Sequence, residues 1–150
     1  MLKNSMKDQS SKKAKLTQAI VAMIAAVISY FTVQHLFFKN DVESELKKAA
    51  VEVNKQTPLQ IDQYTRLDSA SSRGKEHFIY YYTLVNTLKS EVNLDTVNKY
   101  VRTGLIDNVK NNPELKPYRE NNITMNYRYY DKEGEFALEI AVTPDLYKKK

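Results

Sequence analysis

The chain has 150 residues, a formal net charge of +5 and no cysteine. This length allows one compact domain rather than two, and the lack of cysteine excludes both a disulfide and a lipid-modified cysteine. The basic excess lies at the two ends, because residues 39–147 contain 15 Lys or Arg and 17 Asp or Glu. We therefore expect no binding to nucleic acid, which requires a basic surface on the folded part.

The segment from Leu16 to Phe38 contains no charged residue and is long enough to cross the ~30 Å hydrocarbon core of a bilayer as a helix. It exceeds the usual signal-peptide core and ends in bulky aromatic residues, which favours an uncleaved signal anchor over a cleaved signal peptide. Lysines precede the segment and acidic residues follow it, so the positive-inside rule places the N-terminus in the cytoplasm. We expect a single-pass protein of the cytoplasmic (inner) membrane of a bacterium, with its C-terminal domain outside. Its parts would be a disordered basic tail (1–15), a transmembrane helix (16–38), an extracytoplasmic domain (39–147) and a basic tail (148–150).

The extracytoplasmic part is expected to begin with a helix over Val42–Asn54. Asp41 is placed to accept hydrogen bonds from the first free amides of this helix, and apolar residues recur along it at helical spacing. Pro58 ends it, because proline disfavours the helical conformation of the preceding residue.

Two strands are expected next, as an antiparallel hairpin. The first covers residues 59–71, with a bulge around Gln63 and Tyr64, and a turn follows at residues 71–74. The second covers residues 76–86 and carries apolar or aromatic side chains on both faces, which predicts a central strand.

A second helix is expected over Leu94–Lys110, with Asn93 as its N-terminal cap and the Asn-Asn-Pro sequence after it as its end. One stripe along this helix is apolar and should pack on the sheet. The stripe consists of Val97, Val101, Leu105 and Val109.

The last predicted unit is a hairpin of two alternating segments, residues 123–129 and 136–142, around a turn at residues 131–134. In the expected register Arg128 lies diagonal to Glu139. The pairs of that register are Tyr130–Glu135, Tyr129–Phe136, Tyr127–Leu138, Met125–Ile140 and Ile123–Val142. The whole order predicts an α+β domain, α-β-β-α-β-β, with a four-stranded antiparallel sheet and two helices, behind the N-terminal transmembrane helix.

Three segments resemble a family of small bacterial envelope proteins with an N-terminal membrane anchor and no assigned activity. These segments are NKQTPLQIDQYTRLDSA, FIYYYTLVN and LIDNVKNNPELKPYRENNITMNYRYYDKEGEF, and the resemblance spans about residues 50–142. It implies an exported, compact domain. Members of that family often carry a cysteine at the position of Lys110, so their disulfide does not transfer to this chain, and neither does any functional residue.

The sequence predicts no catalytic residue, no cofactor and no metal site. His77 opens a strand beside ordinary turn serines, without a residue that would orient it as a base. The carboxylates of Asp62, Asp68 and Glu76 share one hairpin, but carboxylates at strand ends are usually solvated. The separated glycines do not form a phosphate-binding loop, and no small-molecule substrate is indicated.

The tyrosines indicate an interaction surface, because tyrosine combines a large apolar ring with a polar tip. Tyr81 and Tyr130 are expected to face outward, since the residues two positions away are polar or small. Arg66 and Asp68 are two positions apart on one side of a strand, where they pair with each other or with a partner protein. Most other tyrosines are expected in the core.

These patterns favour a non-enzymatic protein-interaction or assembly module of the bacterial envelope, in the periplasm or its equivalent. Its partners would be the lipid bilayer, through the anchor, and another envelope protein. The alternative is a small-ligand-binding or enzymatic extracytoplasmic domain. That alternative predicts an enclosed pocket beside the sheet on which Tyr80, Arg66 or Asp68 converge.

Overall fold

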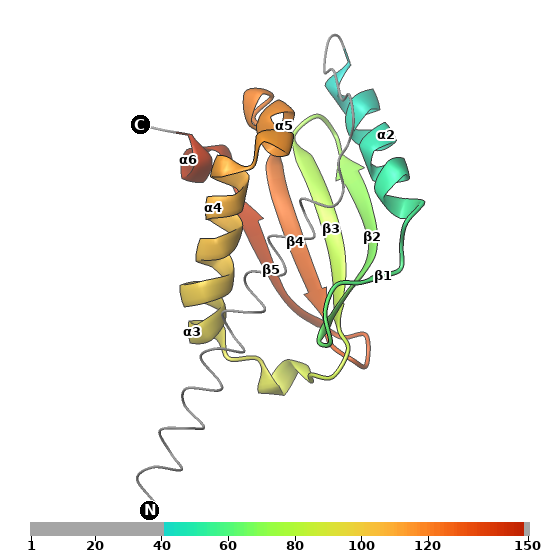
Figure 1. Cartoon of the computed structure of the whole chain (residues 1–150), viewed down its shortest axis with the longest axis vertical. Coiled ribbons are helices and arrows are strands. Elements are labelled where there is room, and N and C mark those ends of the chain that lie inside the picture. The colour runs from blue at the N-terminus through green and yellow to red at the C-terminus, as the bar shows by residue number, and fades with distance from the viewer. Residues whose placement is uncertain (1–40, 149–150) are drawn as a thin grey trace, which may run out of the picture.

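The computed structural model describes residues 41–148, and residues 1–40 and 149–150 lie outside this description. The described part is one five-stranded sheet in the order β1-β2-β3-β4-β5, with its helices on one side (Figure 1). Helix α2 (Val42–Asn54) lies over β2 (Thr65–Arg73), and helix α4 (Thr103–Asn111) lies beside β5 (Phe136–Val142) at the other flank. The fold class is therefore α+β.

The sheet is mixed, which corrects the expected four-stranded antiparallel sheet. Strands β3 (His77–Leu84) and β4 (Thr124–Tyr130) pair in parallel, whereas the other neighbouring strands pair antiparallel. Both expected hairpins exist, but the long helical connection between them crosses the sheet and returns the chain in its original direction. Such a crossover makes the strands that it connects parallel.

The segment predicted as one bulged strand is a hairpin of two strands. Strand β1 (Leu59–Gln60) pairs antiparallel with the start of β2. Asp62 reverses the chain between them, because its Oδ1 accepts the amides of Tyr64 and Thr65 at 2.6 and 2.9 Å. This side chain-to-backbone turn adds the fifth strand to the sheet.

Both predicted long helices are present, with the predicted caps. Asp41 Oδ1 accepts the amide of Ser44 at 3.2 Å, and Asn93 Oδ1 accepts the amide of Thr96 at 2.9 Å. The second helix is divided into α3 (Leu94–Thr96), the π-helical turn η2 (Val97–Arg102) and α4. Four shorter helical elements were not predicted: η1 (Lys89–Glu91), η3 (Pro113–Leu115), α5 (Lys116–Glu120) and α6 (Pro144–Tyr147).

The register of β4 and β5 differs by two residues from the predicted one. Tyr127 lies opposite Ile140, and Arg128 lies directly opposite Glu139 rather than diagonal to it. The larger loop accounts for one residue of the shift, because Asp131 Oδ1 accepts the amides of Glu133 and Glu135, both at 2.9 Å, and the irregularity between Tyr129 and Tyr130 accounts for the other. Along the regular part of the pairing, from Met125 to Tyr129 and from Leu138 to Val142, a shift of two residues keeps the side chains on their predicted faces, whereas a shift of one would reverse them.

The core lies between the helices and the sheet and is rich in tyrosine. Tyr80 stacks on Tyr127 with ring centroids 5.5 Å apart, and Tyr82 stacks on Tyr129 at 5.2 Å, both pairs across the parallel junction. All four rings are at most 4% exposed. From the helices, Leu46, Ala49, Val53, Leu105 and Val109 complete this core.

Within residues 41–148 no helix has the length and apolar character needed to cross a bilayer. The segment predicted to do so, Leu16–Phe38, lies outside the described residues. The predicted architecture of a transmembrane helix followed by a four-stranded domain is therefore corrected to the five-stranded domain that the structure describes.

Candidate interaction face of the sheet

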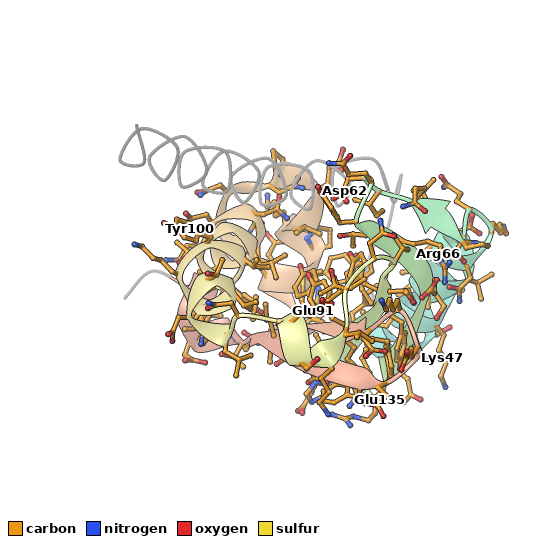
Figure 2. All side chains as sticks on the ribbon, turned by 90° about the horizontal axis from the view of Figure 1, so that it is seen from below. Lys47, Asp62, Arg66, Glu91, Tyr100 and Glu135 are labelled. Carbon is orange, nitrogen blue, oxygen red and sulfur yellow. The ribbon has the colours of Figure 1, made fainter. Side chains whose placement is uncertain are left out.

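One side of the sheet carries no helix within the described part of the chain (Figure 2). Because side chains alternate along a strand, every second residue of each strand points to this side. The register places Arg66, Thr83 and Tyr130 in one row across three strands, and Ser69, Tyr81, Arg128 and Glu139 in the next. We call this side the outer face; its residues are Arg66, Asp68, Ser69, Ser71, Tyr81, Thr83, Asn126, Arg128, Tyr130, Phe136 and Glu139.

An aromatic strip crosses the outer face. The rings of Tyr81 and Tyr130 stack with centroids 6.5 Å apart, and the ring of Phe136 meets Tyr130 edge-on at 5.9 Å. Tyr81 and Tyr130 are half-buried, whereas Phe136 is 46% exposed. The structure thus brings together the two tyrosines that the sequence predicted to face outward.

Phe136 was missed, because the predicted register turned it toward the core opposite Tyr129. In the structure it lies opposite Tyr130, and the pairing between β4 and β5 is irregular between Tyr129 and Tyr130. A bulge reverses the direction of the side chains that precede it, so Phe136 points outward. The sequence signal that was available is Gly134, whose φ of +84° marks a loop that does not need to follow a tight hairpin turn.

The predicted pair of Arg66 and Asp68 forms beside this strip. Arg66 Nε donates to Asp68 Oδ1 at 2.5 Å, and Thr83 Oγ1 donates to Asp68 Oδ2 at 2.5 Å. Alternation along β2 places Asp68 on the side of Arg66, and the register shift between Leu67 and Ser69 brings Ser69 to that side as well. The two side chains remain 41% and 31% exposed, so the pair itself adds less than about 1 kcal/mol to stability.

A second polar network runs across β3, β4 and β5. Asn126 Nδ2 donates to Glu139 Oε1 at 2.7 Å, so Asn126 Oδ1 faces His77 Nδ1, which donates to it at 3.1 Å. Arg128 Nε donates to the other oxygen of Glu139. Partial burial opposes ionisation of Glu139, but the hydrogen bonds from Arg128 and Asn126 hold its pKa below the usual value. The charges of this part of the outer face are thus paired and held in place.

Tyr80, Arg66 and Asp68 do not converge on a pocket. Tyr80 is buried on the helix side of the sheet, whereas Arg66 and Asp68 lie on the outer face. Among the hollows of the described residues are an apolar one of about 50 Å³ and a shallow depression of about 590 Å³ at the loop of Asp131. None of the three residues lines either of these two hollows.

Candidate metal ligands are also dispersed within residues 41–148, where no three of the His, Asp and Glu side chains group around a common point. Asp62 and Asp68 each use at least one carboxylate oxygen in hydrogen bonds to neighbouring groups of the protein. The chemistry that the outer face offers is therefore recognition by aromatic contact and by paired charges.

Three solved structures share this fold. The first, a predicted secreted protein of Pseudomonas aeruginosa, is 16% identical with a TM-score of 0.62, over 71% of this chain and 93% of that one. The others are pilotins of the type II secretion system. AspS of Vibrio cholerae is 11% identical, with a TM-score of 0.53, over 70% and 91% of the two chains. EpsS of Vibrio vulnificus is 9% identical, with a TM-score of 0.56, over 73% and 94%. At these identities the similarity establishes a shared fold.

The predicted localisation, a single-pass protein of the cytoplasmic membrane with the bilayer as a partner, is not sustained. No helix of the described domain spans a membrane, and one protein of the same fold is described as secreted. The expectation of a signal anchor that crosses the membrane as a helix is corrected with it. No curated protein matches the sequence. Residues 41–138, which are most of the described domain, match a family described as a domain of unknown function, and the chain therefore belongs to the DUF8479 family.

Proposed function

We propose that this domain is a non-enzymatic interaction module of the bacterial envelope, which binds a segment of another envelope protein on its outer face. The observation that carries the proposal is the aromatic strip of Tyr81, Tyr130 and Phe136, flanked by paired charges. Aromatic residues and arginine are enriched at protein interfaces, and clustered aromatic anchors contribute most of the binding energy.

The fold supports this proposal without specifying the partner. Two proteins described as pilotins of the type II secretion system share the fold of this domain. A fold does not imply a function, so the assignment of a docking role to this chain rests on the outer face itself. The resemblance of the sequence to small envelope proteins points to the same compartment, as a proposal.

Two exposed apolar residues allow a matched crosslinking experiment. Phe136 is 46% exposed on the outer face, and Val51 is 55% exposed on α2. A photo-crosslinking amino acid placed at position 136 in the full-length protein, in its native cell, should capture a discrete partner, whereas the same amino acid at position 51 should not. Substitution of Tyr81 and Tyr130 by alanine should abolish the product at position 136.

Identical products from positions 136 and 51 would show that the outer face has no specific role. Recovery of the unmodified monomer alone at position 136 would also count against the proposal. Tyr81 and Tyr130 are half-buried and lie outside the core, so their replacement by alanine should leave the domain folded. Circular dichroism of the purified variant distinguishes loss of binding from loss of folding.

A further inference from the structure

Strand β5 forms one edge of the sheet, and no other strand of the described residues lies beyond it (Figure 1). An edge strand carries a row of backbone N–H and C=O groups that its neighbour does not use, and these groups can pair with another chain. The hydrogen bonds of β4, the neighbour of β5, determine which groups of β5 are left unused.

The backbone groups of β4 point alternately toward β3 and toward β5. The amide of Thr124 donates to the carbonyl oxygen of Glu76 at 2.7 Å, so Thr124 bonds to β3, and the next residue bonds to β5. The amide of Asp131 continues this alternation, because it donates to the carbonyl oxygen of Glu135 at 2.8 Å. The register then identifies the hydrogen-bonded pairs of β4 and β5. These pairs are Met125–Val142, Tyr127–Ile140 and Tyr129–Leu138.

The residues between these pairs direct their backbone groups toward the open edge. The N–H and C=O of one trans peptide unit point in opposite directions, so wherever one of them bonds to β4 the other points away from it. The groups that point away are the N–H and C=O of Glu139 and Ala141 and the C=O of Ala137. None of them has a hydrogen-bond partner within residues 41–148. The two alanines carry only a methyl group, and Arg128 and Asn126 hold the Glu139 side chain over the outer face, so side chains of β5 leave these groups open.

At the opposite edge of the sheet, backbone groups of β2 have partners. Strand β1 pairs with β2 at Arg66 and Leu67, and the side chain of Asn54 bonds both backbone groups of Ala70, at 2.9 and 2.7 Å. Proline and free charged side chains are other means by which natural proteins block an edge. Strand β5 contains no proline, and its single charged side chain is already bonded within the sheet. The fold therefore blocks pairing at one edge and permits it at β5.

The charges around β5 indicate which kind of chain pairs there. Residues 131–145 have a net charge of −4, from five acidic residues and one basic residue. These residues are Asp131, Glu133, Glu135, Glu139 and Asp145, against Lys132. Two copies of β5 paired about a two-fold axis would bring these like charges together, which opposes self-association through this edge. A basic segment meets charges of opposite sign. On the helix side, β5 presents the half-buried Leu138, which favours an apolar side chain beside it.

We propose that β5 is a docking edge, which pairs with an extended segment of a partner protein in which basic and apolar residues alternate. The segment adds a sixth strand, antiparallel to β5, and exchanges backbone hydrogen bonds with Glu139 and Ala141. Antiparallel pairs are slightly more stable per residue than parallel ones. The basic side chains lie on the side of Glu139, and the apolar side chains extend the core beside Leu138. This edge consists of backbone groups and not of the outer-face side chains, so its role does not depend on the proposed function.

Hydrogen exchange of the full-length protein tests this pairing. The probe is the heptapeptide Val-Lys-Val-Lys-Val-Lys-Val with both ends blocked. In the free protein, the amides of Glu139 and Ala141 should exchange faster than those of Ile140 and Val142, which bond to β4. A saturating concentration of the peptide should slow exchange at Glu139 and Ala141 by about tenfold or more, because their amides gain acceptors.

Two matched peptides identify the contact without any change to the protein. N-methylation of the central lysine removes an amide that faces β5 and should weaken binding about tenfold or more, whereas N-methylation of the next valine removes an amide that faces away and should have little effect. Equal affinities of the two methylated peptides would overturn the proposal, as would the reverse order. A peptide with glutamate in place of lysine should bind more weakly than the probe, and equal binding would refute the proposed basic partner.

Two substitutions at one position test the edge from the side of the protein. Ala141→Pro removes an N–H that has no partner in the described structure, so an edge strand tolerates it, and it should abolish binding of the probe. Ala141→Ser keeps this N–H and should bind as the native protein does. The dispersion of the amide signals verifies that both variants fold, and unchanged binding by a folded Ala141→Pro protein would overturn the proposal.

The free protein supplies the last outcome. Amides of Glu139 and Ala141 that exchange as slowly as that of Ile140 without any peptide would show that the edge is already occupied. Slow exchange that is lost on dilution would identify a second copy of the chain as the occupant, in place of a partner segment.

Discussion

Both polar atoms of the Asn54 side chain bond to the backbone of Ala70. Asn54 Nδ2 donates to the carbonyl oxygen of Ala70 at 2.9 Å, and Asn54 Oδ1 accepts its amide at 2.7 Å. Asn54 is the last residue of α2, and Ala70 is in the middle of β2. Strand β1 begins only at Leu59, opposite Leu67, and leaves the part of β2 around Ala70 without a neighbouring strand, so the asparagine takes the place of one residue of such a strand.

Replacement of Asn54 by alanine should therefore lower the free energy of unfolding by about 1–3 kcal/mol, because a backbone amide and a carbonyl each lose their partner. Urea denaturation followed by circular dichroism measures the change. Asn98→Ala, at an exposed position of η2, is the control and should have little effect. Equal stability of the two variants would mean that solvent replaces the asparagine at Ala70.

The unpartnered tyrosines predict a contrast in stability among tyrosine-to-phenylalanine variants. Tyr147→Phe removes a buried hydrogen bond of 2.9 Å from its hydroxyl to the carbonyl oxygen of Ile123, and should cost about 1 kcal/mol. Tyr127→Phe and Tyr129→Phe remove hydroxyls without a partner in the described structure, and should leave stability unchanged or raised. Thermal unfolding of the three variants tests this order, and a loss at Tyr129 as large as that at Tyr147 would contradict it.

Ile140→Asp should unfold the domain. Ile140 is 3% exposed and faces the core opposite Tyr127, and an isolated carboxylate buried there costs several kcal/mol. Far-ultraviolet circular dichroism should show the loss of structure at neutral pH. Val51→Asp, at a position that is 55% exposed on α2, should remain folded. A folded Ile140→Asp protein would refute the orientation of β5.

The Asp131 carboxylate predicts a dependence of stability on pH. A hydrogen bond from the amide of Lys89 is the main cause that lowers the pKa of Asp131, and the amides of Glu135 and Glu133 add to it. Because the folded pKa lies below the unfolded one of about 4, this contribution is complete above pH 4 and is lost as the pH falls through the folded value.

Asp131→Asn should therefore destabilise the protein at pH 7, and the difference from the native protein should shrink toward pH 2. Urea midpoints measured across this range test the prediction. Asp107→Asn, which removes an exposed carboxylate of α4, should leave the midpoint at pH 7 unchanged. A difference between native protein and Asp131→Asn that stays constant with pH would contradict an ionised Asp131 as its cause.

The sequence predicted local structure correctly wherever residues close together in the chain determine that structure. Asp41 and Asn93 cap their helices as predicted, because a cap bonds amides only a few residues ahead. The alternation of side chains likewise placed Tyr81 and Tyr130 on one face, since the period of a strand does not depend on its partner. Arg66 and Asp68 were paired correctly for the same reason, whereas the bulge predicted around Gln63 and Tyr64 is the turn between β1 and β2.

Only the tertiary structure decided how segments that are distant in sequence pair with one another. The parallel pairing of β3 with β4 depends on the path of the helical crossover, which no strand pattern reveals. The loop of Asp131, whose carboxylate accepts amides from two separate segments, and the bulge beside Tyr130 together set the register of β5, and the bulge turned Phe136 outward. Periodicity and capping are properties of a short stretch of chain, whereas pairing direction, register and convergence are set when distant stretches pack together.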